Sequence, residues 1–208
     1  MAADVKTVTS GRGERMDGIK RRSQIREVAA GLFDTRGYRE TSMESIAAAI
    51  GIKKASLYYY FRGKDELLVE MHEEMIDLIL AQQQARLDEG VLSWKDQLLG
   101  IMTDLISLQE THPGYLRVFF EHFRELPREV QGPIQEKRDR YGDFVVSVIR
   151  NGIAAGEFRD TDPGITALCI LGSCNWTYQW LRPDGRLSAS ELAKAFWSIY
   201  LGGIEKRF

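Results

Sequence analysis

The sequence contains few of the residues from which metal sites and many active sites are built. Its two cysteines, Cys169 and Cys174, form neither a CxxC motif nor a disulfide framework, which indicates reduced thiols. The three histidines, His72, His112 and His122, lack metal-ligand spacing. No Gly-rich phosphate loop and no nucleophile elbow is present in the sequence. We therefore expect no metal, no cofactor and no catalytic residues.

Long apolar runs are also absent. No segment approaches the roughly 18 consecutive apolar residues that a transmembrane helix requires. The first 15 residues, MAADVKTVTSGRGER, contain no apolar stretch of the kind found in a secretory signal. A cytoplasmic protein is therefore expected. Residues 1–18 are polar and show no hydrophobic periodicity, so they are predicted to form a disordered arm.

The charge is distributed unevenly along the 208 residues. The net charge of −2 gives no sign of a polyanionic partner when it is taken alone. Residues 1–64, however, hold 13 Lys and Arg against 7 Asp and Glu, which leaves the remaining residues strongly acidic. A basic first third on an acidic body indicates that only the first third meets a polyanion such as nucleic acid.

The hydrophobic pattern predicts an all-α chain of nine helices, since no segment reads as a convincing strand. The stripe of Ile25, Ala29, Leu32 and Phe33 predicts a first helix over about 19–36. We expect a three-helix unit over 19–64 and a second helical domain over 65–208. The second and third helices are expected over about 41–50 and 54–61. The later helices are expected over about 64–87, 93–111, 115–123, 133–155, 163–181 and 190–202.

The second and third helices form a pattern typical of a helix-turn-helix. Thr41 and Glu44 have the spacing of a capping box, and Gly51 suits the turn that ends the second helix. The third helix carries three consecutive tyrosines, Tyr58–Tyr60. They spread around most of a helix, so they cannot all face a core. At least one tyrosine must therefore be exposed beside neighbouring lysines, as a DNA-contacting helix requires.

This stretch resembles the DNA-binding domain of TetR-family transcriptional regulators. The likeness covers roughly residues 20–70 and rests on Gly51, Ser56–Phe61, Lys64 and Leu67–Leu68. It implies that the second helix opens against the DNA backbone and that the third faces bases and backbone. It also implies phosphate contacts from Tyr60 and Lys64. The residues expected at DNA are Ser42, Met43, Lys53, Lys54, Ala55, Ser56, Tyr58, Tyr59, Tyr60 and Lys64.

The remainder of the chain carries two further expectations. The aromatic end of the 163–181 helix is apolar on more than one face, which indicates a second buried surface. In TetR-family proteins the last two helices form a four-helix bundle across a two-fold axis, so we expect a homodimer. Its interface is expected to include Tyr178, Trp180, Leu181, Phe196, Ile199, Tyr200 and Gly203.

The family resemblance also implies an effector held between the middle helices. The candidates for its pocket are Phe119, Phe120, Phe123, Tyr141, Phe144, Val148, Leu171 and Trp176, although an ordinary packed core explains the same residues. The stretches Trp180–Gly185 and Leu201–Ile204 resemble those of regulators of lipid and steroid degradation, which respond to acyl-CoA thioesters. The expected effector is therefore a long-chain acyl-CoA or a related hydrophobic thioester. Arg and Lys residues between 117 and 140 are expected near its phosphates, although a solvated charged face explains the same residues.

The sequence thus predicts a homodimeric repressor that a small hydrophobic effector releases from a palindromic operator in double-stranded DNA. Three alternatives stay open. The chain could be a multidrug-sensing repressor of an efflux pump, an enzyme with a hydrophobic substrate pocket, or a helical scaffold for protein interactions. The enzyme lacks a recognisable acid–base or nucleophile constellation, and the scaffold has no need of exposed tyrosines beside lysines.

Overall fold

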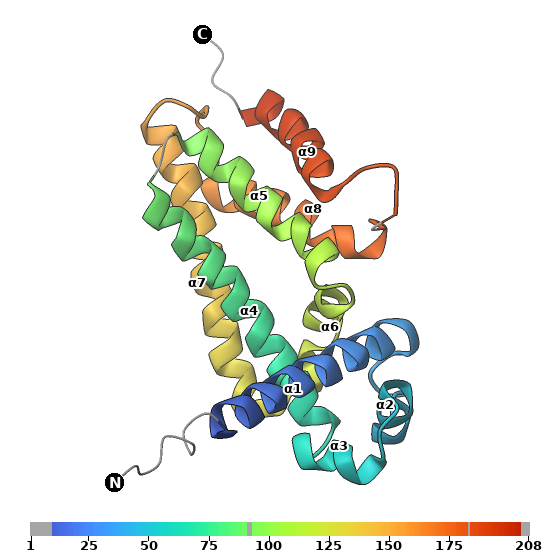
Figure 1. Ribbon diagram of the computed structural model, residues 1–208. Coiled ribbons are helices and arrows are strands. Elements are labelled where there is room, and N and C mark those ends of the chain that lie inside the picture. The colour runs from blue at the N-terminus through green and yellow to red at the C-terminus, as the bar shows by residue number, and fades with distance from the viewer. Residues whose placement is uncertain (1–9, 91–92, 183, 205–208) are drawn as a thin grey trace, which may run out of the picture.

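The structure is a computed structural model that describes residues 10–90, 93–182 and 184–204 (Figure 1). Within those ranges it contains nine α-helices, two short 3-10 helices and no strand, so the all-α prediction is confirmed. The α-helices are α1 (Ser10–Arg36), α2 (Met43–Ile50), α3 (Lys54–Tyr60), α4 (Lys64–Glu89), α5 (Trp94–Thr111), α6 (Tyr115–Glu121), α7 (Arg128–Ala154), α8 (Pro163–Asn175) and α9 (Ala189–Ile204). The 3-10 helices span Phe123–Glu125 and Trp176–Gln179.

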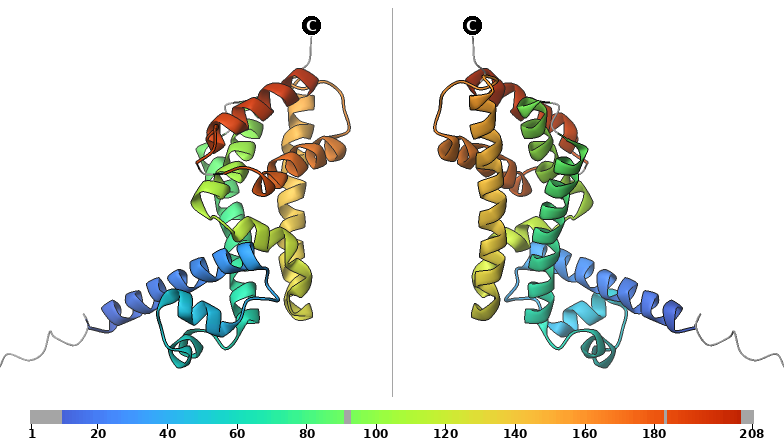
Figure 2. Two further views of the ribbon diagram at one scale, coloured as in Figure 1. Left: turned by 90° about the vertical axis from the view of Figure 1, so that its right-hand side faces the viewer. Right: turned by 90° about the vertical axis from the view of Figure 1, so that its left-hand side faces the viewer.

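The helices form a small unit at one end of the long helix α4 and a larger bundle along it. Helices α1, α2 and α3 gather at the start of α4, and α7 runs along α4 (Figures 1 and 2). Helix α5 packs against α4 and α7, α8 packs on α5 and α7, and α9 packs on α5. Short helix α6 packs against both α1 and α4 and so joins the two parts. Because α4 belongs to both parts, a displacement of this helix moves the small unit relative to the bundle.

The small unit has an apolar core in which every helix takes part. Ile25 and Phe33 of α1, Ile46 of α2, Leu57 of α3 and Phe61 just after it are fully buried. Gly51 ends α2 with a left-handed backbone, φ +74°, and its N–H bonds to the carbonyl oxygens of the last turn. Only glycine adopts this conformation without strain, which is why the turn between α2 and α3 falls at this residue.

Three local predictions were wrong. Helix α1 begins at Ser10, so residues 10–18 are helical and not part of a disordered arm, whereas residues 1–9 lie outside the described part. The cap of α2 is Ser42, which exchanges hydrogen bonds with Ser45, while Thr41 is buried and donates to the carbonyl of Gly37. Helix α7 begins at Arg128 and contains Pro133, which the sequence pattern placed at its start.

Candidate nucleic-acid interface and apolar cavity

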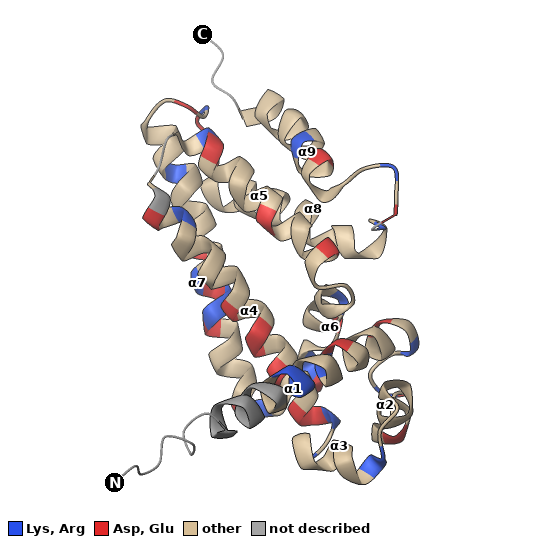
Figure 3. Cartoon of the chain, viewed as in Figure 1, with Lys and Arg blue, Asp and Glu red and all other residues tan. Residues whose placement is uncertain are grey.

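Helix α3 exposes most of the side chains that were predicted to meet DNA. Lys53, Lys54, Ala55 and Ser56 at its start are exposed. Tyr59 is 84% exposed and Tyr58 46%, whereas Tyr60 is half-buried against the core. The argument that the three tyrosines cannot all face inward is therefore confirmed. Figure 3 colours Lys and Arg positions blue on the backbone, and a blue segment lies where α3 begins, at the outer end of the small unit.

The pair of Lys54 and Glu44 links the two helices of this exposed surface. The Lys54 ammonium contacts the Glu44 carboxylate, and both side chains are well exposed to solvent. A hydrogen bond to Glu44 raises the pKa of Lys54, so the ammonium stays charged across the physiological range. An exposed pair of this kind contributes little to stability, which leaves the ammonium free to exchange its carboxylate for another anion.

Two predicted DNA contacts are occupied inside the protein. Met43 is buried, because its side chain lies on the inner face of the first turn of α2, so that prediction was wrong. The Lys64 ammonium donates to the carbonyl oxygens of Tyr38 at 2.8 Å, Thr41 at 3.0 Å and Arg39 at 3.1 Å. An ammonium has three N–H donors, and here all three fasten the turn between α1 and α2. In this conformation Lys64 therefore has no donor left for a phosphate.

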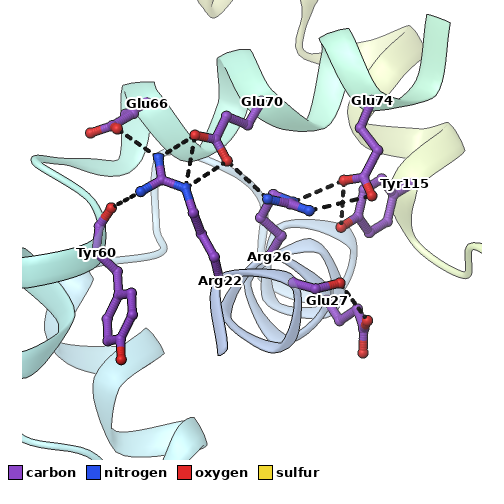
Figure 4. Close-up of polar contacts among 9 residues, drawn as sticks. Arg22, Arg26, Glu27, Tyr60, Glu66, Glu70, Glu74 and Tyr115 are labelled. Atoms are coloured by element: carbon purple, nitrogen blue, oxygen red, sulfur yellow. Dashed lines mark hydrogen bonds and ion pairs between the residues drawn. The ribbon is translucent and has the colours of Figure 1, made fainter. Parts of the chain in front are cut away.

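Helix α4 is fastened to α1 by a ladder of charged side chains. Arg22 and Arg26 lie one turn apart on α1 and face three acidic side chains on α4 (Figure 4). The acidic partners are spaced four residues apart, which places them on one face of α4. These three residues are Glu66, Glu70 and Glu74.

Arg22 also reaches the end of α3. Its guanidinium donates to the backbone carbonyl of Tyr60 and lies 4.1 Å from the centre of the Phe61 ring. The last carbonyl groups of a helix have no hydrogen-bond donor within the helix, and Arg22 supplies a donor to the last carbonyl of α3. The same side chain therefore connects α1, α3 and α4, a role that the sequence pattern did not reveal.

A cavity of about 160 Å³ lies inside the larger bundle. Five helices contribute to its wall, with Ile76 and Ile79 from α4, Leu105 from α5 and Leu171 from α8. Most of the lining is aliphatic or aromatic, which suits an apolar ligand. Its further lining residues are Phe119, Phe120, Arg138, Tyr141, Gly142 and Asn175.

Four of the eight residues proposed from the sequence for an effector pocket lie in the wall of this cavity. Phe119, Phe120, Tyr141 and Leu171 line the cavity. The other predicted residues lie elsewhere: Val148 is buried in the core, Phe123 and Phe144 are partly buried against it, and Trp176 is 59% exposed. The aliphatic side chains of α4 were missed because its stripe was read only as a packing face.

Among the described residues that line the cavity, Arg138 alone is charged. Its guanidinium lies 3.8 Å from the centre of the Phe119 ring and 4.5 Å from that of Phe123. It donates to the carbonyl oxygen of Phe119, while its Nε–H has no partner among the described residues. Burial lowers the pKa of Arg138 to about 10, so the guanidinium still carries its charge at neutral pH.

A histidine lies on α4 behind the cavity wall. His72 is fully buried, its Nδ1 is 2.9 Å from the carbonyl oxygen of Leu68, and its ring lies 5.6 Å from that of Phe119. Burial lowers the pKa of His72 to about 4, and the nearby charge of Arg138 adds to this shift. The imidazole is therefore neutral at physiological pH.

Large apolar side chains are exposed on the outer faces of α8 and α9. Ile199 is 71% exposed, Leu168 67% and Ile165 61%, and Trp180 is also exposed. Both helices lie on the outside of the bundle (Figure 2). Among the other predicted interface residues, Gly203 is exposed and Leu181, Phe196 and Tyr200 are partly buried. Tyr178 stacks on Phe120 of the same chain, with ring centres 5.6 Å apart.

No group of three His, Cys, Asp or Glu side chains that could hold a metal ion occurs in the described ranges. None of the helices described is long and apolar enough to cross a membrane.

The chain matches two sequence families over most of its length. Residues 25–71 match the family described as bacterial regulatory proteins, tetR family, and residues 91–204 match the tetracyclin repressor-like C-terminal domain. The HTH-type transcriptional repressor KstR2 of Mycobacterium tuberculosis is 28% identical, over 89% of this chain and 94% of that protein. Its structure, described as a ketosteroid transcriptional regulator, superposes with a TM-score of 0.84 at 27% identity, over 90% of this chain and 96% of that one.

A second solved structure is similar over most of both chains. It is AibR in complex with isovaleryl coenzyme A and operator DNA, which is 30% identical. It superposes with a TM-score of 0.75 over 86% of this chain and 97% of that one.

Proposed function

The chain belongs to the TetR family of transcriptional regulators, and from this premise we propose that it is a homodimeric repressor that an acyl effector releases from a palindromic operator. The observation that carries the proposal is the combination of an exposed, basic and aromatic α3 with an apolar cavity on the same connecting helix, α4. Such a protein acts on chromosomal DNA, which places it in the cytoplasm.

Helix α3 is the element that reads the operator. The exposed set of Lys54, Ser56, Tyr58 and Tyr59 offers donors and ring faces to base edges and phosphates in a major groove. Lys53 adds charge at the helix start. Charge in this part of the chain supplies the counterion release that drives DNA association.

The exposed apolar faces of α8 and α9 support dimerisation. Leu168 and Ile199, which would otherwise lie in water, are buried when two copies pack these faces together. A two-fold dimer carries two copies of α3, so its operator is a near-palindrome with half-sites about one helical turn apart.

The effector acts through α4. Ile76 and Ile79 contact the ligand cavity, and Glu70 and Glu74, within two turns on the same helix, hold α1. A ligand that binds better to one position of α4 therefore shifts the angle at which α1 and α3 approach DNA. The shift is limited by the difference in ligand affinity between the two states.

An acyl effector is favoured by two named relatives. AibR was solved with isovaleryl coenzyme A and operator DNA, and KstR2 is described as a ketosteroid regulator. Isovaleryl groups and ketosteroids both have apolar bodies, which suit the aliphatic and aromatic wall of this cavity. The second candidate is a multidrug-sensing repressor, whose effectors are neutral or cationic and apolar.

The test begins with selection of bound duplexes from a randomised pool by the full chain. We expect enrichment of an inverted repeat, and release of the enriched duplex by an acyl-CoA but not by free CoA. A pool that stays random after repeated rounds contradicts operator binding. Release by neutral or cationic drugs, with no response to any acyl compound, identifies the multidrug sensor instead.

A further inference from the structure

Arg138 is a half-buried cation that has no carboxylate partner among the described residues. Arginine taken out of water is normally paired with a carboxylate, because desolvation of its charge costs several kcal/mol. Here no carboxylate among the described residues contacts the guanidinium, which has only the Phe119 carbonyl and two ring faces. Carbonyl and ring contacts stabilise a cation less than a carboxylate does. The residue therefore has capacity for an anionic or strongly polar oxygen.

Two other polar groups share the wall with Arg138. Tyr141 and Asn175 line the same cavity, and no hydrogen bond of either side chain to another described residue is present. A phenol and an amide both donate hydrogen bonds to oxygen. The rest of the wall is apolar and offers no competing acceptor side chain. Three residues that carry donor groups thus belong to the wall of one small, mainly apolar cavity.

The volume of the cavity limits what lies between these donors. An apolar cavity of about 150 Å³ is known to accommodate benzene, so about 160 Å³ suits a branched chain or a single ring. A long acyl chain exceeds this volume and would extend out of the cavity, so we infer a shorter acyl group than the long-chain effector expected from the sequence. The phosphates of a CoA ester would lie outside the cavity.

We propose that Arg138 anchors the acyl oxygen of a compact effector, a branched-chain or single-ring carboxylic acid or its CoA thioester, with Tyr141 and Asn175 as supporting donors. The proposal rests on the repressor function given above and adds the effector's size and its contact. On binding, the guanidinium turns from the Phe119 carbonyl at the end of α6 to the ligand's oxygen. A free carboxylate supplies the missing charge, whereas a thioester supplies only a carbonyl.

The test is calorimetric titration of the full chain with isovalerate, cyclohexanecarboxylate, their CoA esters and palmitoyl-CoA. Arg138→Gln is the test variant and Arg138→Lys retains the charge. Arg140→Gln is the matched control, because Arg140 lies two residues along α7 but is exposed and does not line the cavity. We expect Arg138→Gln to weaken binding of the compact acyl compound by at least about tenfold, as for a hydrogen bond to a charged group. Arg138→Lys should recover part of the affinity, and Arg140→Gln should change nothing.

The compounds separate the two sources of the acyl oxygen. If Arg138→Gln weakens binding of the free acid more than binding of its ester, Arg138 contacts a carboxylate. If the substitution weakens binding of the ester alone, Arg138 contacts the thioester carbonyl. Unchanged affinities in folded Arg138→Gln, or tighter binding of palmitoyl-CoA than of every compact compound, overturn the proposal. So does specific operator binding without a response to any compact acyl compound, which leaves the repressor intact. Absence of operator binding refutes the repressor, while the titration still decides the role of Arg138.

Discussion

The Arg22 guanidinium on α1 lies against the Glu70 carboxylate on α4, with its Nε 3.1 and 3.2 Å from the two carboxylate oxygens. The same guanidinium donates to the backbone carbonyl of Tyr60, the last residue of α3. One side chain thus ties α3, which we propose reads DNA, to α4, which contributes to the cavity wall. We expect any coupling between the two proposed sites to depend on this connection.

We predict that Arg22→Met and Glu70→Gln are energetically coupled. Both side chains are partly exposed, so the coupling in a double-mutant cycle should be modest, about 0.5 kcal/mol or slightly more. The measurement is the free energy of unfolding in urea for the wild type and three variants. If Arg22 contacts a phosphate instead, Arg22→Met will weaken DNA binding while the cycle shows no coupling.

Replacing Tyr59 by Ala should weaken specific DNA binding and leave folding intact. The ring is 84% exposed, so its loss should change the free energy of unfolding by no more than about 0.5 kcal/mol. Loss of a base or backbone contact typically costs about 1–3 kcal/mol of binding energy. Fluorescence anisotropy with the selected duplex measures the second quantity and thermal unfolding the first. An unfolded variant would show that Tyr59 belongs to the core.

Met43→Ala should lower the stability of the fold and leave specific DNA binding unchanged, the reverse of Tyr59→Ala. The side chain is buried in the small unit, and removal of buried methionine atoms costs about 2–5 kcal/mol of stability. Below the lowered melting temperature, the folded fraction should bind the selected duplex with unchanged sequence preference. Altered preference at one base position, with stability unchanged, would restore Met43 to the DNA interface.

The buried histidine predicts a specific pH dependence of stability. The pKa of His72 is about 4 in the folded chain, against an ordinary value of 6.5, so the unfolded chain takes up the proton first as pH falls. Stability is therefore retained above about pH 6.5 and lost between pH 6.5 and 4, by about 3 kcal/mol in total. His72→Leu should reduce the pH dependence of the free energy of unfolding, measured in urea, over this range. The control His112→Gln, at the α5–α6 turn, should leave that dependence as it is. Equal slopes in all three proteins would show that His72 does not titrate as stated.

Charge on the outer face of α8 or α9 should break the dimer. Leu168→Glu and Ile199→Glu place a carboxylate where we propose an apolar contact between subunits, and an unpaired buried charge is costly. Light scattering should report monomers for both, and a dimer for the control Gln135→Glu on the exposed face of α7. If both variants remain dimeric, Leu168 and Ile199 do not belong to the dimer interface.

The sequence predicted what depends on local pattern and missed what depends on packing between helices. Gly51 and the three tyrosines could be interpreted because turn geometry and helical periodicity are local properties. The cap was misplaced by one residue because Thr41 and Ser42 both carry a hydroxyl, and only the backbone path decides which one faces the helix. Lys64 and Arg138 were read as phosphate ligands, since the sequence does not show which carbonyls lie opposite their side chains.

The lining of the cavity also depends on packing between helices, which the sequence pattern does not predict. Phe119 and Tyr141 were predicted because aromatic residues crowd those helices, yet Phe144 lies on the same helix as Tyr141 and does not line the cavity. The direction in which the Phe144 side chain points depends on how α7 crosses α5 and α8. The hydrophobic pattern of a single helix does not predict that crossing.

The most direct test of the central claim, that α3 reads a specific duplex through charge and exposed tyrosines, is an anisotropy titration of the selected duplex from 50 to 200 mM salt. We predict that affinity falls steeply, by orders of magnitude if six or more phosphates are contacted, and that a scrambled duplex binds far more weakly at every salt concentration. Affinity independent of salt, or equal for the selected and scrambled duplexes, would contradict operator recognition by this chain.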